Sequence, residues 1–238
     1  MFYIRMADLN IKIENRYQYV RWICRDYTVA PMEKTDITVH ISEEEIQAEL
    51  AVSKYPDLPD YAESICIYRK ICRQLPQDAE AFLLHCALIE YEGCGYAFAA
   101  KSGTGKSTHI SFWQKKFGDD VHIVNGDKPI LRFKENKLYA YGTPWCGKEN
   151  LQINTSVPLK AICFLERALQ NEIRPIQADE AVMRIFHQIL TPDDLQSADA
   201  LIPLLDRTLR EIPCYVLSCN MSEEAAEVAY RGMNELVQ

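Results

Sequence analysis

The sequence lacks any apolar run of about 18 residues, the length that a membrane-spanning helix requires. Its N-terminus carries charged residues every few positions and lacks the apolar segment of roughly 7–15 residues that marks a signal peptide. No tract is low in complexity. These absences argue against a membrane-spanning or secreted protein, and they predict a cytoplasmic one.

An excess of basic residues is also missing. The chain has 26 Lys and Arg against 34 Asp and Glu, a formal net charge of −8. Proteins that bind nucleic acid or anionic membranes usually present positive charge, so we expect neither partner. With 48% hydrophobic and 25% charged residues, the composition is typical of a globular protein.

The nine cysteines include no C-x-x-C pair, and their number is odd. Most lie within apolar runs such as AICFLE and CYVLSC, where a free cysteine behaves as a small buried hydrophobic side chain. We therefore expect reduced thiols in the core rather than disulfides or a zinc site.

We predict one α/β domain over residues 1–238, because no repeat and no flexible linker interrupts the chain. Residues 1–75 should form a β-rich N-terminal portion, in which YQYVRWIC (17–24) is one of the strands and 60–75 is a helix. The apolar runs and turn signals of residues 76–238 predict a core with a mixed, largely antiparallel sheet, and this core should bind the nucleotide.

Residues 95–113, GYAFAAKSGTGKSTHISFW, carry the strongest functional motif. A strand that enters a glycine-rich turn and then a helix directs backbone N–H groups at one point, where the helix dipole favours phosphate. Lys106 should reach the β- and γ-phosphates, and the Ser107 hydroxyl should ligate Mg²⁺. The predicted nucleotide-binding residues are Ser102, Gly103, Thr104, Gly105, Lys106, Ser107 and Thr108.

One residue departs from the usual phosphate-loop pattern G-x-x-x-x-G-K-[ST], because Ala100 stands where the first glycine is expected. Alanine costs little there unless the backbone needs a positive φ. We therefore predict a working site for ATP, another nucleoside triphosphate or pyrophosphate. The alternative is a helix start rich in serine and glycine that binds no ligand.

The segment LLHCALIEYEGCGYAFAAKSGTGKSTH, followed by VHIVNGDKPILRF and YGTPWCGK, resembles the kinase domain of the HPr kinase/phosphorylase family. That superfamily also includes phosphoenolpyruvate carboxykinase, and the resemblance covers roughly residues 80–170. It implies a P-loop domain of the phosphoenolpyruvate carboxykinase/HPr kinase type. It also implies that His85 pairs electrostatically with the γ-phosphate or with Asp127. The alternative is that His85, which lies amid apolar residues, is only a satisfied interior side chain.

In that family a strand after the loop helix ends in two acidic residues, but this chain has Gly126 at the first position and Asp127 at the second. The resemblance implies that the pair divides metal binding from orientation of the attacking hydroxyl, so Asp127 would do both. A plain alternative exists, because Asn-Gly between apolar runs is a strong signal for a type I′ hairpin. Asp127 would then only flank a turn.

Residues 142–151, GTPWCGKENL, predict a shaped loop. Lys148 is a candidate for a positive clamp on the transferring phosphoryl group. The alternative is that Lys148 is a solvated loop lysine and that Trp145 covers the core. His109, just inside the loop helix, either approaches the nucleotide or only covers the surface of the helix.

These residues together predict a kinase that depends on ATP and Mg²⁺. It would transfer the γ-phosphoryl group to a hydroxyl, either a serine of a protein or peptide or a small serine-like acceptor. The alternative is a nucleotide-binding module with weak or no catalysis, because Gly126 replaces an acid. A carboxykinase is disfavoured because the chain is short and lacks a cluster of Arg and metal-binding Lys and His. A homo-oligomer is compatible with all three.

Overall fold

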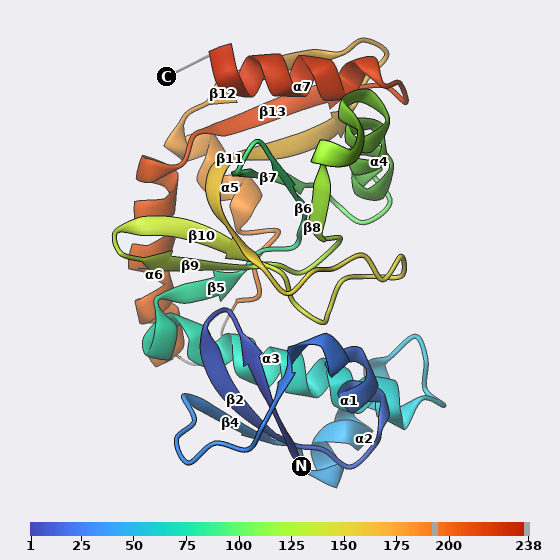
Figure 1. The fold of residues 1–238 in the computed structure, drawn as a ribbon, viewed down its shortest axis with the longest axis vertical. Coiled ribbons are helices and arrows are strands. Elements are labelled where there is room, and N and C mark those ends of the chain that lie inside the picture. The colour runs from blue at the N-terminus through green and yellow to red at the C-terminus, as the bar shows by residue number, and fades with distance from the viewer. Residues whose placement is uncertain (192–194, 236–238) are drawn as a thin grey trace.

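The computed structural model describes residues 1–191 and 195–235, which form a mixed α/β structure with two sheets (Figure 1). The N-terminal sheet has the order β3 (Thr28–Val29), β1 (Phe2–Met6), β2 (Leu9–Glu14) and β4 (Ile37–His40). Every second side chain of β1 and β2 is buried, because successive side chains of a strand point to opposite faces. This sheet therefore buries one face.

Two helical segments follow β2, namely α1 (Tyr19–Ile23) and η1 (Arg25–Tyr27), and two helices follow β4, namely α2 (Glu43–Val52) and α3 (Pro59–Ala79). The strand predicted over 17–24 is wrong, since this segment forms α1. Its aromatic and branched residues favour a strand locally, but Val20 and Ile23 are three positions apart and both are buried, as on one face of a helix. The helix predicted over 60–75 is confirmed as α3 and runs longer.

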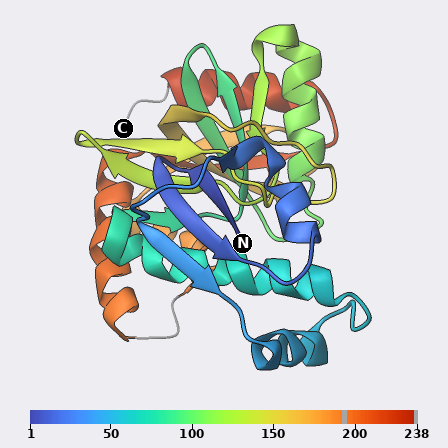
Figure 2. The same cartoon turned by 60° about the horizontal axis from the view of Figure 1, so that its bottom comes forward.

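Helix α3 joins the N-terminal sheet to the rest of the molecule. Figures 1 and 2 both show it alongside the blue N-terminal strands. Ile67, Ile71 and Leu75 lie four residues apart and are fully buried in one hydrophobic cluster with those strands. The same cluster includes Ile130 and Trp145 of the core, so the two parts share a continuous apolar interior.

The large sheet has the order β5 (Ala81–Leu83), β9 (Ile130–Lys134), β10 (Lys137–Tyr141), β11 (Ser156–Arg167), β7 (Cys94–Ala99), β6 (Cys86–Tyr91) and β8 (His122–Asn125). β13 (Cys214–Cys219) also pairs with β11, and β12 (Glu172–Ile176) pairs with β13. The pairings β7–β11 and β11–β13 are parallel, whereas the others in this sheet are antiparallel. The prediction of a mixed, largely antiparallel sheet is confirmed.

Helices cover both faces of this sheet (Figure 1). One face packs on α4 (Lys106–Phe117) and α7 (Glu224–Glu235), and the other on α5 (Ala178–Ile185) and α6 (Leu195–Glu211). In β7, Phe98 packs with Trp113 of α4, whereas Ala97 and Ala99 belong to the cluster with α5 and α6. Burial on both faces explains the nearly continuous apolar runs of the central strands. Within the described ranges, no helix has the length and apolar character needed to cross a membrane.

All nine cysteines are free thiols, as predicted, and Cys24, Cys72, Cys86, Cys146, Cys163 and Cys214 are buried. Burial raises the pKa of the Cys86 and Cys163 thiols well above their ordinary value. They therefore remain protonated at neutral pH and act as small core side chains.

Candidate functional site

The glycine-rich loop joins β7 to α4 at one end of the large sheet. Gly103 and Gly105 have φ angles of +80° and +123°, in a region that residues with a side chain rarely adopt. These two glycines therefore set the turn that leads into α4. The N–H groups of the first turn of α4 have no partners within the helix, and the helix dipole adds positive potential there. Such a helix start favours an anion.

Ala100 fits this loop without backbone strain. Its φ lies outside the positive region, so the backbone does not demand glycine at this position. Its carbonyl oxygen accepts a hydrogen bond from Nζ of Lys106 at 3.2 Å. The expected tolerance of alanine is confirmed.

Arg167, at the end of β11, attaches this loop to the sheet. Its Nε donates to the carbonyl oxygen of Thr104 at 3.2 Å, and its Nη2 donates to the carbonyl oxygen of Gly103. The parallel pairing that sets Phe164 opposite Ala99 places the end of β11 beside the loop. Sequence reasoning missed Arg167, because only the strand pairing brings it close.

Three of the predicted catalytic residues converge at the start of α4. His85 Nε2 lies 2.9 Å from Oδ1 of Asp127 and 3.2 Å from Nζ of Lys106. The other carboxylate oxygen of Asp127 pairs with Nζ of Lys128. The structure therefore places a lysine, a histidine and a carboxylate in direct contact.

The charges of this group perturb one another. Burial acts to raise the pKa of Asp127, but the hydrogen bond from His85 and the ammonium of Lys128 outweigh it and hold that pKa well below its usual range. Burial lowers the pKa of Lys106, and the carboxylate of Asp127 offsets part of this effect. A partly desolvated ammonium is stabilised by further negative charge, which a bound phosphate supplies.

His85 lies in the break between β5 and β6, and the main chain holds it there. Its backbone N–H donates to the main-chain carbonyl of Gln188 at 2.6 Å. The Gln188 side-chain amide, in the orientation that satisfies its neighbours, donates to the carbonyls of His85 (3.1 Å) and Ala100 (3.2 Å). The N–H of Cys86 donates to the carbonyl of Asp127 at 3.1 Å. Gln188 carries no motif in the sequence, so its bridging position was not predicted.

The type I′ hairpin considered for Asn125-Gly126 is wrong. Strand β8 pairs with β6, whereas β9 pairs with β5 and β10. Gly126 also lacks the positive φ that this turn requires. Asp127 therefore does not flank a hairpin between β8 and β9.

Asn125 instead organises the turn with its side chain. Its Oδ1 accepts hydrogen bonds from the backbone N–H groups of Asp127 (2.9 Å) and Lys128 (2.7 Å). Its Nδ2 donates to the carbonyl oxygen of Thr143 at 2.9 Å, and the side chain is fully buried. This arrangement is an Asx turn, the other role that an Asn in a turn commonly has. Asn125 therefore fixes the backbone that presents Asp127.

Gly126 has no room for a side chain. A Cβ atom there would lie 2.8 Å from the main-chain carbonyl oxygen of Cys146. An acid at this position would therefore require the loop of residues 142–151 to move. This close approach is a physical reason for the missing first acid.

We expect Gly126→Asp to destabilise the protein by about 1–3 kcal/mol, the usual cost of overpacking, without increasing any catalytic activity. The free energy of unfolding in urea measures the cost. Gly126→Ala is the matched control, since it adds the same Cβ without a charge and should lose similar stability. A Gly126→Asp variant of wild-type stability and higher turnover would contradict this explanation.

The loop of residues 142–151 packs on α3. The indole Nε1 of Trp145 donates to Oγ of Ser64 at 3.0 Å, and Trp145 belongs to the core cluster, so it covers the core. Lys148 is exposed, and together with Asp127 it lines a cleft of about 900 Å³ between the core and the N-terminal portion. Its role as a clamp stays a prediction.

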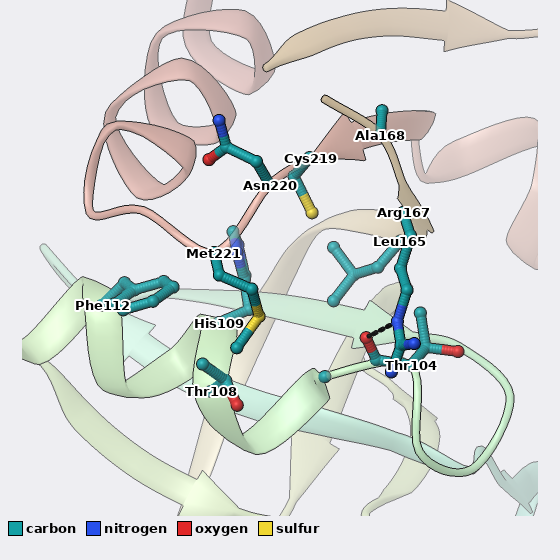
Figure 3. A pocket seen from close by; sticks show the side chains of 11 residues that line it. Thr104, Thr108, His109, Phe112, Leu165, Arg167, Ala168, Cys219, Asn220 and Met221 are labelled. Carbon is teal, nitrogen blue, oxygen red and sulfur yellow. Dashed lines mark hydrogen bonds between the residues drawn. The ribbon is translucent and has the colours of Figure 1, made fainter. Parts of the chain in front are cut away.

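A second cavity, of about 410 Å³, lies on another side of the loop (Figure 3). Phe112, Leu165 and Met221 provide apolar lining there, and Asn220 adds an amide. His109 also lines this cavity, and its Nε2 accepts a hydrogen bond from the indole of Trp113 at 3.1 Å. Burial lowers the pKa of His109 to about 3, so its ring is neutral at physiological pH.

The residues predicted to hold Mg²⁺ are Ser107 and Asp127, and both line the 900 Å³ cleft. Mg²⁺ prefers oxygen ligands and is commonly held by one or two carboxylates together with phosphates and water. This donor set fits that pattern. Within residues 1–191 and 195–235, no group of three or more His, Cys, Asp or Glu is placed to hold a metal ion by itself.

The fold and the site define a mixed α/β protein with a candidate phosphate-binding loop beside a lysine, histidine and aspartate cluster. The family model described as SynChlorMet cassette protein ScmC matches residues 63–229, more than half of the chain, so the protein belongs to this family. No curated protein matches the sequence.

Among solved structures, the chain is similar to the HPr(Ser) kinase/phosphatase from Coxiella burnetii. The identity is 10%, the match covers 64% of this chain and 98% of that chain, and the TM-score is 0.37. A similarity of this size carries no argument about activity. The function must therefore be inferred from the residues of the site.

Proposed function

We propose that this protein is a kinase that depends on ATP and Mg²⁺ and transfers the γ-phosphoryl group to a hydroxyl of a protein, a peptide or a small serine-like molecule. The observation that carries the proposal is the contact of Lys106, His85 and Asp127 at the N-terminus of α4. The S-G-T-G-K-S-T sequence of the loop, read as a P-loop of the HPr kinase type, supports it further.

In this proposal, residues 102–108 and Lys106 hold the phosphates. The backbone N–H groups of the loop and the first turn of α4 donate to phosphate oxygens, and Nζ of Lys106 contacts the β- and γ-phosphates. Ser107 and Asp127 would hold Mg²⁺, whose charge would neutralise that of the phosphates. Such positioning and charge neutralisation supply most of the catalysis in phosphoryl transfer.

Asp127 orients the acceptor hydroxyl toward the γ-phosphorus and receives its proton. The acceptor oxygen forms the new bond to phosphorus, while the bond from phosphorus to the β–γ bridging oxygen breaks and ADP leaves with that electron pair. The low pKa of Asp127 makes it a weak base. A weak base suffices where the transition state is loose and orientation matters more than early proton removal.

The two cavities divide the substrates between them. The 410 Å³ cavity, with its apolar Phe112, Leu165 and Met221, suits the nucleoside. The 900 Å³ cleft contains Asp127 and Lys148, so it is the place for the γ-phosphate and the acceptor. The loop of residues 102–108 contributes to the lining of both.

One observation favours a second candidate, a nucleotide-binding module with weak or no catalysis. Asp127 is the one acid at this turn, and its two oxygens are engaged by His85 and Lys128. An acceptor hydroxyl must share one of these oxygens with its partner or displace that partner. If His85 and Lys128 keep the acceptor hydroxyl from both oxygens, nucleotide binds without transfer.

A thermal-shift panel with ATP, GTP and pyrophosphate, each with and without Mg²⁺, tests the common part of both candidates. A ligand at 100 times its Kd adds about 2.7 kcal/mol of stability, so a bound nucleotide should raise Tm measurably. Release of labelled phosphate or its transfer to serine-containing peptides then separates the kinase from the binding module. Failure of all three ligands to raise Tm would contradict both.

A further inference from the structure

The N-terminal portion lines the proposed transfer cleft with aromatic and apolar side chains. They come from α1, from the segment before α3 and from the first turn of α3. We call this surface the aromatic wall, and it consists of Tyr19, Trp22, Tyr55, Leu58 and Tyr61. These residues line the same cleft as Lys106 and Asp127.

The wall is contiguous and open to solvent. The ring of Tyr19 lies 6.1 Å from that of Trp22 and 6.2 Å from that of Tyr61, and Tyr61 lies 5.7 Å from Tyr55. Trp22, Tyr55 and Leu58 are 56%, 45% and 47% exposed. A continuous exposed apolar surface of this kind marks an interaction site, and Trp and Tyr are the residues that most often carry binding energy.

The wall leads directly to the proposed catalytic group. Tyr68 lies seven residues after Tyr61 on α3, so both lie on one face of the helix about 10 Å apart. The ammonium of Lys128 lies 5.7 Å from the centre of the Tyr68 ring, and Lys128 pairs with Asp127. Only a substrate long enough to extend from Asp127 past Tyr68 therefore reaches the wall.

The distance between the wall and the proposed catalytic group indicates what kind of molecule covers the wall. An extended peptide advances about 3.3 Å per residue, so the distance from Tyr68 to Tyr61 equals about three residues. A serine-sized molecule at Asp127 would not touch the wall, whereas a peptide chain would. The exposed rings offer apolar contact, and the guanidinium of Arg25 already covers part of the Trp22 ring at 4.9 Å.

We propose that the phosphoryl acceptor is a hydroxyl on a peptide chain and that the aromatic wall binds large apolar or aromatic side chains about three or more residues from it. This inference rests on the proposed kinase function. It adds the substrate class and the surface that selects the sequence.

A peptide library tests the selection. Each peptide has one serine, with Trp, Leu, Ala or Glu fixed in turn at the positions up to six residues on either side, and labelled ATP reports transfer. We expect Trp or Leu, about three or more residues to one side of the serine, to increase kcat/KM about tenfold over Ala or Glu. Equal rates for all flanking residues would overturn the proposal.

Variants of the wall test whether its residues cause the preference for Trp or Leu near the serine. Trp22→Ala and Tyr55→Ala should raise KM for the preferred peptide about tenfold and leave KM for ATP unchanged. The same variants should have little effect on a peptide with Ala at the selected position, since the contact is then already absent. Met183→Ala, 66% exposed on α5, is the matched control and should change neither constant. A loss of equal size with both peptides would overturn the proposal.

Tryptophan fluorescence gives a readout that needs no phosphoryl transfer. Trp113 and Trp145 are 0% and 8% exposed, so iodide quenching reports mainly on Trp22. The preferred peptide should protect Trp22 from iodide in wild-type protein. Protection without transfer supports the peptide site and contradicts the kinase, whereas transfer without protection or flanking preference supports the kinase and contradicts the wall.

Discussion

Replacement of Lys106 by alanine should lower kcat for γ-phosphoryl transfer by about 10³-fold or more. Its side chain is largely buried at the start of α4, where the ammonium contacts His85 and the carbonyl of Ala100. The proposed function makes Lys106 the main fixed positive charge on the transferring group. Groups with that role in phosphoryl transfer contribute factors of about 10³–10⁵. Single-turnover transfer of labelled phosphate measures the loss of transfer, and calorimetry measures the binding of ATP.

Controls separate lost charge from lost structure. Lys106→Arg keeps the charge but alters its reach and should recover only part of the activity. Lys137→Ala removes an exposed lysine at the start of β10 and should leave turnover and Tm unchanged. ATP consumption at the wild-type rate in Lys106→Ala would remove the basis of the kinase proposal.

Asp127→Asn should lower kcat by about 10²–10⁴-fold, the range for loss of a group that accepts a proton in the transition state. The amide is the same size but carries no charge and is not a base, so it orients the acceptor poorly. Loss of the negative charge also weakens the contacts with His85 and Lys128. Nucleotide binding should persist, because residues 102–108 are unaltered.

Asp120→Asn is the matched control, because Asp120 is exposed in η2 (Gly118–Asp120), after α4. Asp127→Asn should lower kcat without a matching change in nucleotide Kd, whereas Asp120→Asn should change neither constant. If Asp127→Asn binds nucleotide and also turns over at the wild-type rate, Asp127 has only a structural role. If, in addition, the wild-type protein itself shows almost no transfer, the nucleotide-binding module becomes the better candidate.

The loop shows how far local sequence reaches. Gly103 and Gly105 stand where the backbone has positive φ, and Ala100 stands where it does not, so the strand, turn and helix follow from neighbouring residues. The central strands of the large sheet were also predictable, because both faces of the sheet are buried there and these strands are largely apolar. Segment 17–24 was not, since its residues suit a strand as well as a short buried helix.

Asn125 shows a different limit. The dipeptide Asn-Gly has two common uses, as a type I′ hairpin and as an Asx turn. The choice between them depends on which strands β8 and β9 pair with, and neither pairs with the other. The local sequence around Asn125 therefore cannot distinguish a type I′ hairpin from an Asx turn.

The sequence by itself determined the loop of residues 102–108 and the apolar strands around it, because these features depend on φ preferences and on the burial of neighbouring side chains. Only the tertiary structure decided that His85 contacts Asp127, that Arg167 holds the loop, and that an aromatic wall from the N-terminal portion lines the cleft. The physical reason is that these contacts join residues distant in the chain. Strand pairing and the packing of α3 set their distances, and no local preference encodes them.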